Sequence, residues 1–235
     1  MLPNKTSAPI FCYVTDRASL RSSEPRDALT ALLDCIASAA AVGVPWIQLR
    51  EKDLAARDLA RLTSAAIARC AAAHPGAGNL LSSRTRIFVN DRLDVAIAER
   101  AAGVHLGDNS LPVGEAKRLL QYLSPENRPA EFLAGVSCHS LASAQAAAAA
   151  GADYIFFGPI CPTPSKQMYG PAQGLQRLAE VCGAVNIPVL AIGGINMENA
   201  ADCLASGASG IAAIRLFQQP RELQTVASFL HSFMV

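Results

Sequence analysis

Charged residues are scarce in this chain, and the two signs almost cancel. Only 17% of its 235 residues are charged, and the formal net charge is +1. So small a net charge gives no reason to expect nucleic acid or an acidic surface as a partner, although a local basic pocket is compatible with it. Because 51% of the residues are hydrophobic, the composition excludes an intrinsically disordered chain.

Long apolar runs and an export signal are also missing. No uninterrupted apolar run approaches the roughly 18 residues that a membrane span needs. The first ten residues hold one lysine and no apolar core, unlike a secretory signal peptide. We therefore expect no membrane partner and a cytoplasmic location.

Paired cysteines are the third absence. The chain has seven cysteines, an odd number, with no C-x-x-C motif and no cysteine or histidine pair at zinc-ligand spacing. This pattern favours buried, reduced thiols in a cytoplasmic protein over a disulfide framework or a structural zinc site.

A regular alternation of short and long apolar segments runs along the chain. Eight short runs predict strands at residues 11–15, 46–50, 86–90, 103–106, 132–136, 154–157, 188–192 and 211–215. Helical patterns lie between them at 27–42, 56–73, 113–122, 141–150, 175–185 and 197–206. Most of the runs are uniformly apolar, as in parallel strands that are buried on both faces.

One local unit also recurs, in which an alanine-rich helix ends at a glycine and a strand follows, for example at Gly43, Gly103, Gly151 and Gly207. This repetition predicts the α/β class and a (β/α)8 TIM barrel as a single domain spanning 1–235. The barrel is expected at about 11–217 and a C-terminal helix at about 220–233. The alternative is a doubly wound open sheet, but no G-x-G-x-x-G follows an early strand.

Active sites of such barrels lie at the carboxyl ends of the strands. After the second predicted strand, alternation places Gln48, Arg50 and Lys52 on one side. Two cations there suit a phosphate or diphosphate. The alternative is a solvated strand end whose cations pair with Glu51.

The third and fourth strands end in candidate metal ligands. Asn90 and Asp91 offer an amide for phosphate and a carboxylate for a divalent cation, or else an Asx turn that starts a helix. Asp108 follows the fourth strand and either binds metal or caps the segment that begins near Pro112. His105 lies within an apolar strand and is expected to be a hydrogen-bonded core residue.

The fifth strand is followed by Ser137 and His139, which alternate onto one side. His139 has the chemistry of a general acid or base, but Ser140 could instead cap a helix with His139 incidental. A dyad of Cys138 and His139 is disfavoured because neighbouring strand residues point apart.

The last three strand ends suggest anion binding. After the sixth strand, two hydroxyls and a lysine form either an oxyanion clamp or an ordinary solvated loop: Thr163, Ser165 and Lys166. Gly193 and Gly194, after the seventh, would let phosphate approach backbone N–H groups, and Arg215 ends the eighth. Alternatively, the two glycines form a plain tight turn, and Arg215 pairs with a nearby carboxylate.

Together these motifs resemble the thiamine phosphate synthase family, with its thiazole tautomerase branch. The resemblance runs from Tyr13 to about Phe217, and its most specific pieces are Gln48-Leu49-Arg50-Glu51-Lys52, Val89-Asn90-Asp91-Arg92, Gly103-Val104-His105-Leu106-Gly107, Gly158-Pro159, Pro162-Thr163-Pro164-Ser165-Lys166 and Ala191-Ile192-Gly193-Gly194-Ile195. The resemblance implies a reaction that joins hydroxymethylpyrimidine diphosphate to hydroxyethylthiazole phosphate and releases diphosphate.

The resemblance also implies a role for each matching residue. Gln48 would contact the pyrimidine with Ser137 nearby, and Asp91 would bind Mg2+, with Asp108 as a second candidate. The diphosphate would be held by Arg50, Lys52, Asn90 and Lys166. The thiazole phosphate would be held by Thr163, Ser165, Gly193 and Gly194, and Arg215 would fit the same phosphate.

Two residues depart from the synthase pattern. Ser110 stands where synthases usually carry a second metal-binding aspartate, and Arg215 stands where they usually carry a serine. Both departures are more typical of the tautomerase branch, which would use His139 as acid and base and no metal cofactor. A regulator that binds phosphorylated ligands without turnover is a third alternative, and the oligomeric state is left open by the sequence.

Overall fold

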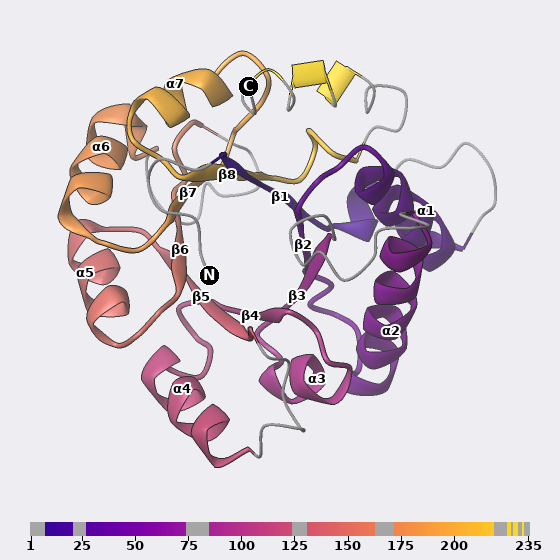
Figure 1. The fold of residues 1–235 in the computed structure, drawn as a ribbon. Helices are drawn as coiled ribbons and strands as arrows, with labels where there is room; N and C mark the ends of the chain where they lie inside the picture. Colours follow the sequence, from indigo (N-terminus) through magenta and orange to yellow (C-terminus); the bar gives the residue numbers. More distant parts are fainter. Residues whose placement is uncertain are drawn as a thin grey trace.

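The computed structural model describes residues 8–20, 27–73, 85–123, 131–162, 172–218, 225–226, 228–229 and 232. Eight parallel strands close into a barrel in sequence order, with helices around the outside (Figure 1). The strands are β1 Ile10–Val14, β2 Trp46–Leu49, β3 Arg86–Asn90, β4 Gly103–Leu106, β5 Leu133–Cys138, β6 Tyr154–Phe157, β7 Val189–Ile192 and β8 Gly210–Ala213. The predicted (β/α)8 barrel is confirmed.

The barrel closes where the first strand meets the last. β1 pairs with β2 through Cys12 and Trp46, and with β8 through Ile10 and Gly210. A Cβ at Gly210 would lie 2.0 Å from the carbonyl oxygen of Ile10, so only glycine allows this approach.

Two strand ends differ from the prediction in ways that matter for the site. β5 continues two residues past 136, because Ser137 and Cys138 still pair with β6. β8 ends at Ala213, so Arg215 lies two residues beyond the strand and is exposed. Ser137 is therefore a barrel residue, whereas Arg215 belongs to the turn that follows.

The helices lie outside the strands, as the alternation predicts. They are α1 Ala28–Ala41, α2 Ala56–Ala72, α3 Leu93–Ala98, α4 Val113–Tyr122, α5 Leu141–Ala149, α6 Gly174–Ala184 and α7 Ala200–Ala205, with a 3-10 turn η1 at Arg17–Ser19. The sequence reading missed α3, which is only six residues long. The C-terminal helix expected at 220–233 falls mostly outside the described residues.

α7 begins three residues later than predicted, and the cause is local. The side chain of Asn196 accepts the N–H groups of Glu198 and Asn199, while the Asn199 side chain accepts the N–H of Asn196. These side-chain bonds replace a first helical turn.

The apolar core has two layers. The larger one lies between the strands and the helices. The smaller one fills the barrel and consists of Ile10, Cys12, Val14, Trp46, Phe88, Leu133, Tyr154, Phe156, Leu190 and Ala212. Within it the Trp46 ring lies 4.7 Å from Phe88 and 4.8 Å from Tyr154. The barrel interior is therefore filled by side chains, which close the bottom of the mouth.

None of the seven cysteines forms a disulfide, and six of them are buried. Cys161 differs from the expectation, since it is half-buried. Among the helices that the structure describes, none is long and apolar enough to cross a membrane.

Candidate active site

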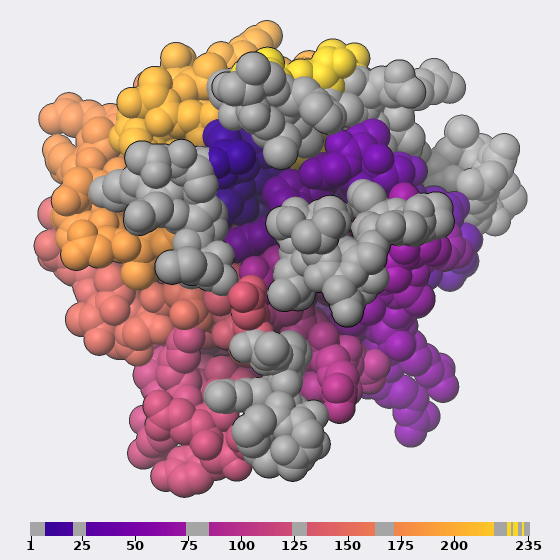
Figure 2. Space-filling model, in the orientation of Figure 1, coloured from indigo at the N-terminus to yellow at the C-terminus, as the bar shows by residue number. Residues whose placement is uncertain are grey.

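The candidate site lies at the carboxyl ends of the strands, which meet at one mouth because all eight are parallel. Figure 2 shows the end of the barrel that faces the viewer in Figure 1, where distant parts of the chain lie around the barrel axis. Indigo, purple and magenta atoms of the first half lie around its centre, beside salmon and orange atoms of the second half.

A chain of hydrogen bonds links the ends of β2 and β3. Gln48 Nε2 donates to Asn90 Oδ1 at 2.8 Å, and Asn90 Nδ2 donates to Asp91 Oδ2 at 2.6 Å. Gln48 is only 2% exposed, so its amide is held in one orientation. Three residues predicted for substrate and metal are thus brought together.

Asp91 has an unusual backbone and a fully engaged carboxylate. Its φ is 62°, in the left-handed region that few non-glycine residues adopt. Its Oδ1 accepts the N–H of Gly107 at 3.2 Å and the hydroxyl of Ser110. Asp91 does not cap α3, since Arg92 occupies the N-cap without a side-chain bond. The Asp91 carboxylate therefore does not form the helix-starting Asx turn that was the alternative interpretation.

The partners of the Asp91 carboxylate among the described residues are all uncharged. Its partners are an amide, a backbone N–H and a hydroxyl, and no lysine, arginine or histidine of the described chain forms an ion pair with it. An anion at a barrel mouth without a cationic partner suits a divalent cation.

His139 connects β5 to the ends of β4 and β6. Its Nδ1 donates to the carbonyl of Gly158, since that oxygen can only accept. Its Nε2 lies 3.5 Å from Asp108 Oδ2. Asp108 does not cap α4, whose N-cap is Pro112 without a side-chain bond. Ser140 caps α5, as the alternative interpretation predicted. His139 nevertheless contacts Gly158 and Asp108.

The carboxylates do not form a ready-made metal cage. Across the described residues, no three histidine, cysteine or acidic side chains gather closely enough to hold a metal ion. Any cation here would need ligands from a substrate or from water.

Ser137 is hydrogen-bonded to His105, which lies deeper in the barrel. The Nε2 of His105 lies 3.0 Å from Ser137 Oγ, and its Nδ1 lies 3.3 Å from Tyr154 Oη. His105 is 1% exposed, as expected of a hydrogen-bonded core histidine. The sequence reading missed this link to Ser137, although alternation along β4 and β5 turns both residues into the barrel.

Cys138 is turned away from the site. It packs in the outer core between strands and helices. Burial raises the pKa of its thiol from 9.0 to about 11, so it is not a thiolate near neutral pH. The expectation that Cys138 and His139 form no dyad is confirmed.

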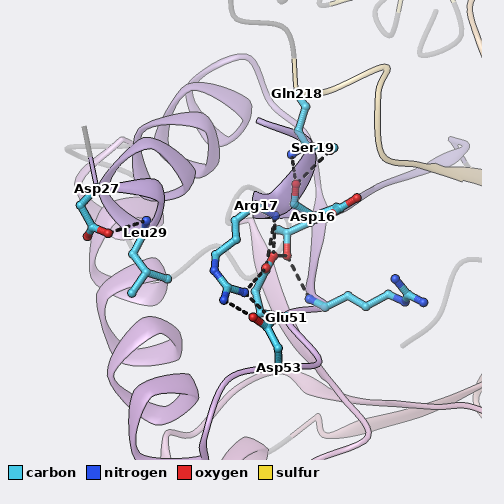
Figure 3. Close-up of polar contacts among 10 residues, drawn as sticks. Asp16, Arg17, Ser19, Asp27, Leu29, Glu51, Asp53 and Gln218 are labelled. Atoms are coloured by element: carbon cyan, nitrogen blue, oxygen red, sulfur yellow. Dashed lines mark hydrogen bonds and ion pairs between the residues drawn. The ribbon is translucent and has the colours of Figure 1, made fainter. Parts of the chain in front are cut away.

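Glu51 does not pair with its cationic neighbours. Its carboxylate instead binds Arg17, with Nη1 to Oε2 at 2.9 Å (Figure 3). In the part of the chain that the structure describes, the side chains of Arg50 and Lys52 take part in no ion pair. Sequence reasoning missed Arg17, which follows β1 and carries no motif.

The turn after β7 is shaped by two glycines. Gly193 and Gly194 have φ values of 95° and 69°. A Cβ at Gly194 would lie 2.7 Å from the Cβ of Cys161, and one at Gly193 would lie 2.6 Å from the Cα of Pro159. Only glycine fits both positions.

Three predicted phosphate ligands cannot be placed, because Thr163, Ser165 and Lys166 lie outside the described residues. Arg215 is exposed and forms no ion pair with any described carboxylate, so the partner proposed for it as an alternative is not found there.

Comparison with known proteins identifies the family. A family model described as thiamine monophosphate synthase matches residues 20–217, and the chain belongs to this family. It is 48% identical over 176 residues to a thiamine-phosphate synthase from Methanoculleus marisnigri, covering 75% of each chain. It is 38% identical over 218 residues to one from a Roseiflexus species, covering 91% of this chain and 80% of the relative.

A solved structure agrees with both. The thiamine phosphate pyrophosphorylase from Pyrococcus furiosus superimposes with a TM-score of 0.72 at 28% identity, covering 97% of this chain and 98% of that one. The resemblance inferred from the strand-end motifs is thereby confirmed.

Proposed function

We propose that the chain is a thiamine-phosphate synthase, which joins hydroxymethylpyrimidine diphosphate to hydroxyethylthiazole phosphate. The observation that carries this proposal is the hydrogen-bonded series Gln48–Asn90–Asp91 at the strand ends. Two cations that follow Gln48 in the sequence, Arg50 and Lys52, form no ion pair with any residue that the structure describes. That combination suits a substrate with a polar ring and a diphosphate.

Arg50 and Lys52 are proposed to hold the diphosphate, with Asn90 and Lys166. As the carbon–oxygen bond to the diphosphate breaks, negative charge grows on the leaving oxygen. Cations placed in advance stabilise that charge without having to reorganise. The methylene carbon left behind forms its new bond to the thiazole nitrogen, so one diphosphate leaves for each thiamine phosphate formed.

Gln48 and Ser137 are proposed to position the pyrimidine. Both are held by neighbours, Gln48 by Asn90 and Ser137 by His105. Pre-oriented amide and hydroxyl groups recognise a heterocycle at little entropic cost. Thr163, Ser165, Gly193, Gly194 and Arg215 are proposed for the thiazole phosphate.

Mg2+ is proposed as the cofactor, and the residues present fit it. Asp91 supplies an anionic oxygen ligand that no cation among the described side chains neutralises, and Asp108, after the neighbouring strand β4, is a second candidate. One or two carboxylates with substrate phosphates and water form a usual Mg2+ environment. The bound ion would neutralise charge on the diphosphate.

The two alternatives are less well supported. The relatives described above carry the synthase name, whereas a tautomerase has less use for Arg50, Lys52 and Asp91. A regulator without turnover would not need a carboxylate that lacks an ion-pair partner among the described residues at this end of the barrel. His139 remains the candidate acid or base only for the tautomerase reaction.

Complementation in a bacterium tests the proposal. The gene is expressed in a strain that lacks thiamine-phosphate synthase and is grown without thiamine. We expect the wild-type chain to restore growth and Asp91→Asn to fail at equal expression. Growth restored by neither protein, with both present and folded, would contradict the assignment.

A further inference from the structure

Glu51 occupies an unexpected position between the two proposed diphosphate-binding cations. It separates Arg50 from Lys52 in the sequence, yet it is only 5% exposed. Its carboxylate accepts four contacts, from the Thr15 hydroxyl at 2.6 Å, from the Arg17 N–H at 3.2 Å to each oxygen, and from Arg17 Nη1 at 2.9 Å (Figure 3).

Thr15 uses its hydroxyl in both directions. It donates to Glu51, and it accepts the backbone N–H of Arg50 at 2.9 Å. Its own N–H donates to the carbonyl of Gln48 at 2.9 Å. Thr15 is fully buried, so these bonds are shielded from water. The main chain on both sides of Leu49 is therefore fixed from the end of β1.

Arg17 compensates the buried charge of Glu51. Without a partner, a buried carboxylate would be costly and would attract Arg50 or Lys52. Arg17 also pairs with Asp53, at 2.7 Å from Nη1 to Oδ1, and these contacts raise the pKa of its guanidinium. Its segment is anchored on the other side, where Gln218 Nε2 donates to the Asp16 carbonyl at 2.7 Å (Figure 3).

We propose that Thr15 and Glu51 are positioning residues, which fix the Arg50–Lys52 segment and leave both cations available for the diphosphate. The inference rests on the proposed function, because it assigns Arg50 and Lys52 to that substrate. Neither Thr15 nor Glu51 touches the reacting atoms in this account.

Thr15→Val tests the proposal, because it keeps the shape of the side chain and removes both hydrogen bonds. Thr15→Ser, which keeps the hydroxyl, is the matched control. We expect Thr15→Val to raise the KM for the pyrimidine diphosphate about tenfold, as displaced binding groups commonly do, with the KM for the thiazole phosphate unchanged. Thr15→Ser should stay within about twofold of wild type.

A purely structural role would give a different pattern. It would lower the melting temperature and the active fraction, and both substrates would be affected alike. An unchanged KM for the pyrimidine diphosphate in folded Thr15→Val would overturn the proposal.

Glu51→Gln provides a second variant if Thr15→Val folds poorly. The amide no longer neutralises Arg17 and cannot accept all of the same contacts, so the same KM should rise. If both residues act through one path, the double variant should be no worse than the more impaired single one. Additive losses, or an unchanged KM in folded Glu51→Gln, would contradict the shared role.

Calorimetric titration with inorganic diphosphate and Mg2+ separates this inference from the proposed function. Weaker binding by Thr15→Val than by wild type supports the positioning role even if no thiamine phosphate is made. Equal binding by the two overturns the positioning role while leaving wild-type turnover intact. No binding and no product with wild type would overturn both.

Discussion

Ser110 donates a hydrogen bond to the same oxygen of Asp91 that accepts the N–H of Gly107. Its hydroxyl also accepts from Gly107, at 2.7 Å. A serine thus stands directly against the proposed metal ligand, in the place where the family resemblance leads one to expect a second carboxylate. The hydrogen bond from Ser110 therefore holds the Asp91 carboxylate in place although Ser110 carries no charge.

Ser110→Asp should make the site dependent on metal for its stability. Two neighbouring carboxylates repel, so we expect the free energy of unfolding in EDTA to fall by about 1 kcal/mol. Mg2+ should restore it, giving a larger rise in melting temperature than wild type shows. Ser110→Asn serves as the uncharged control. Equal responses of all three proteins to Mg2+ would show that no cation binds near Asp91.

Asp91→Asn should strongly reduce Mg2+-dependent turnover. Some stability should also be lost, because the amide nitrogen cannot accept a hydrogen bond that a carboxylate oxygen accepts. The amide keeps the shape of the side chain but removes the only charge that Asp91 offers. We expect kcat/KM for product formation to fall by about 100-fold or more, which corresponds to roughly 3 kcal/mol of transition-state stabilisation. Initial rates across a Mg2+ titration measure this, and Asp108→Asn tests the second candidate. Wild-type rates in Asp91→Asn would remove Asp91 from the metal site.

Gly194→Ala should both destabilise the barrel and impair the mouth. Its φ of 69° and the carbonyl oxygen of Cys161, 2.9 Å from the added Cβ, leave no room for a side chain. We expect a loss of about 2 kcal/mol in urea unfolding. Gly183→Ala is the control, because that helical glycine has nothing within 4 Å of the added Cβ. It should gain about 0.5 kcal/mol. Equal changes in the two variants would contradict the described turn.

Stability should fall in alkaline solution. Burial raises the pKa of Cys70 to about 12, and those of Cys138 and Cys203 to about 11. Unfolded thiols ionise near 9.0, so the stabilisation is complete below that pH and is lost as pH rises through the folded values. Each thiol contributes a slope of about 1.4 kcal/mol per pH unit in this window.

Urea unfolding at pH about 8 and about 10.5 measures the loss. Cys138→Ala should show a smaller difference between the two conditions than wild type, because one titrating thiol is gone. A difference that does not change in Cys138→Ala would mean that this thiol does not contribute.

The barrel could be predicted from the sequence because its signal is repeated. Eight apolar runs and recurring glycines at helix ends specify strand number and order, and parallel strands bring their ends to one mouth. The approach of Gln48, Asn90 and Asp91 followed from that rule. Short elements were harder, since α3 has too few turns to show a helical period.

The connections between side chains could not be predicted in the same way. Glu51 was weighed as a partner for its own neighbours, but it binds Arg17, which is 34 residues away and follows another strand. The link between His105 and Ser137 likewise depends on the register of β4 and β5. Contacts of this kind depend on how strands are staggered, and no local pattern records that.

The most direct test is turnover by the purified wild-type chain. It is incubated with hydroxymethylpyrimidine diphosphate and hydroxyethylthiazole phosphate, with Mg2+ or with EDTA, and thiamine phosphate and diphosphate are both quantified. The account predicts equal amounts of the two products with Mg2+ and neither with EDTA. Intact substrates after incubation of folded protein with Mg2+ would contradict it.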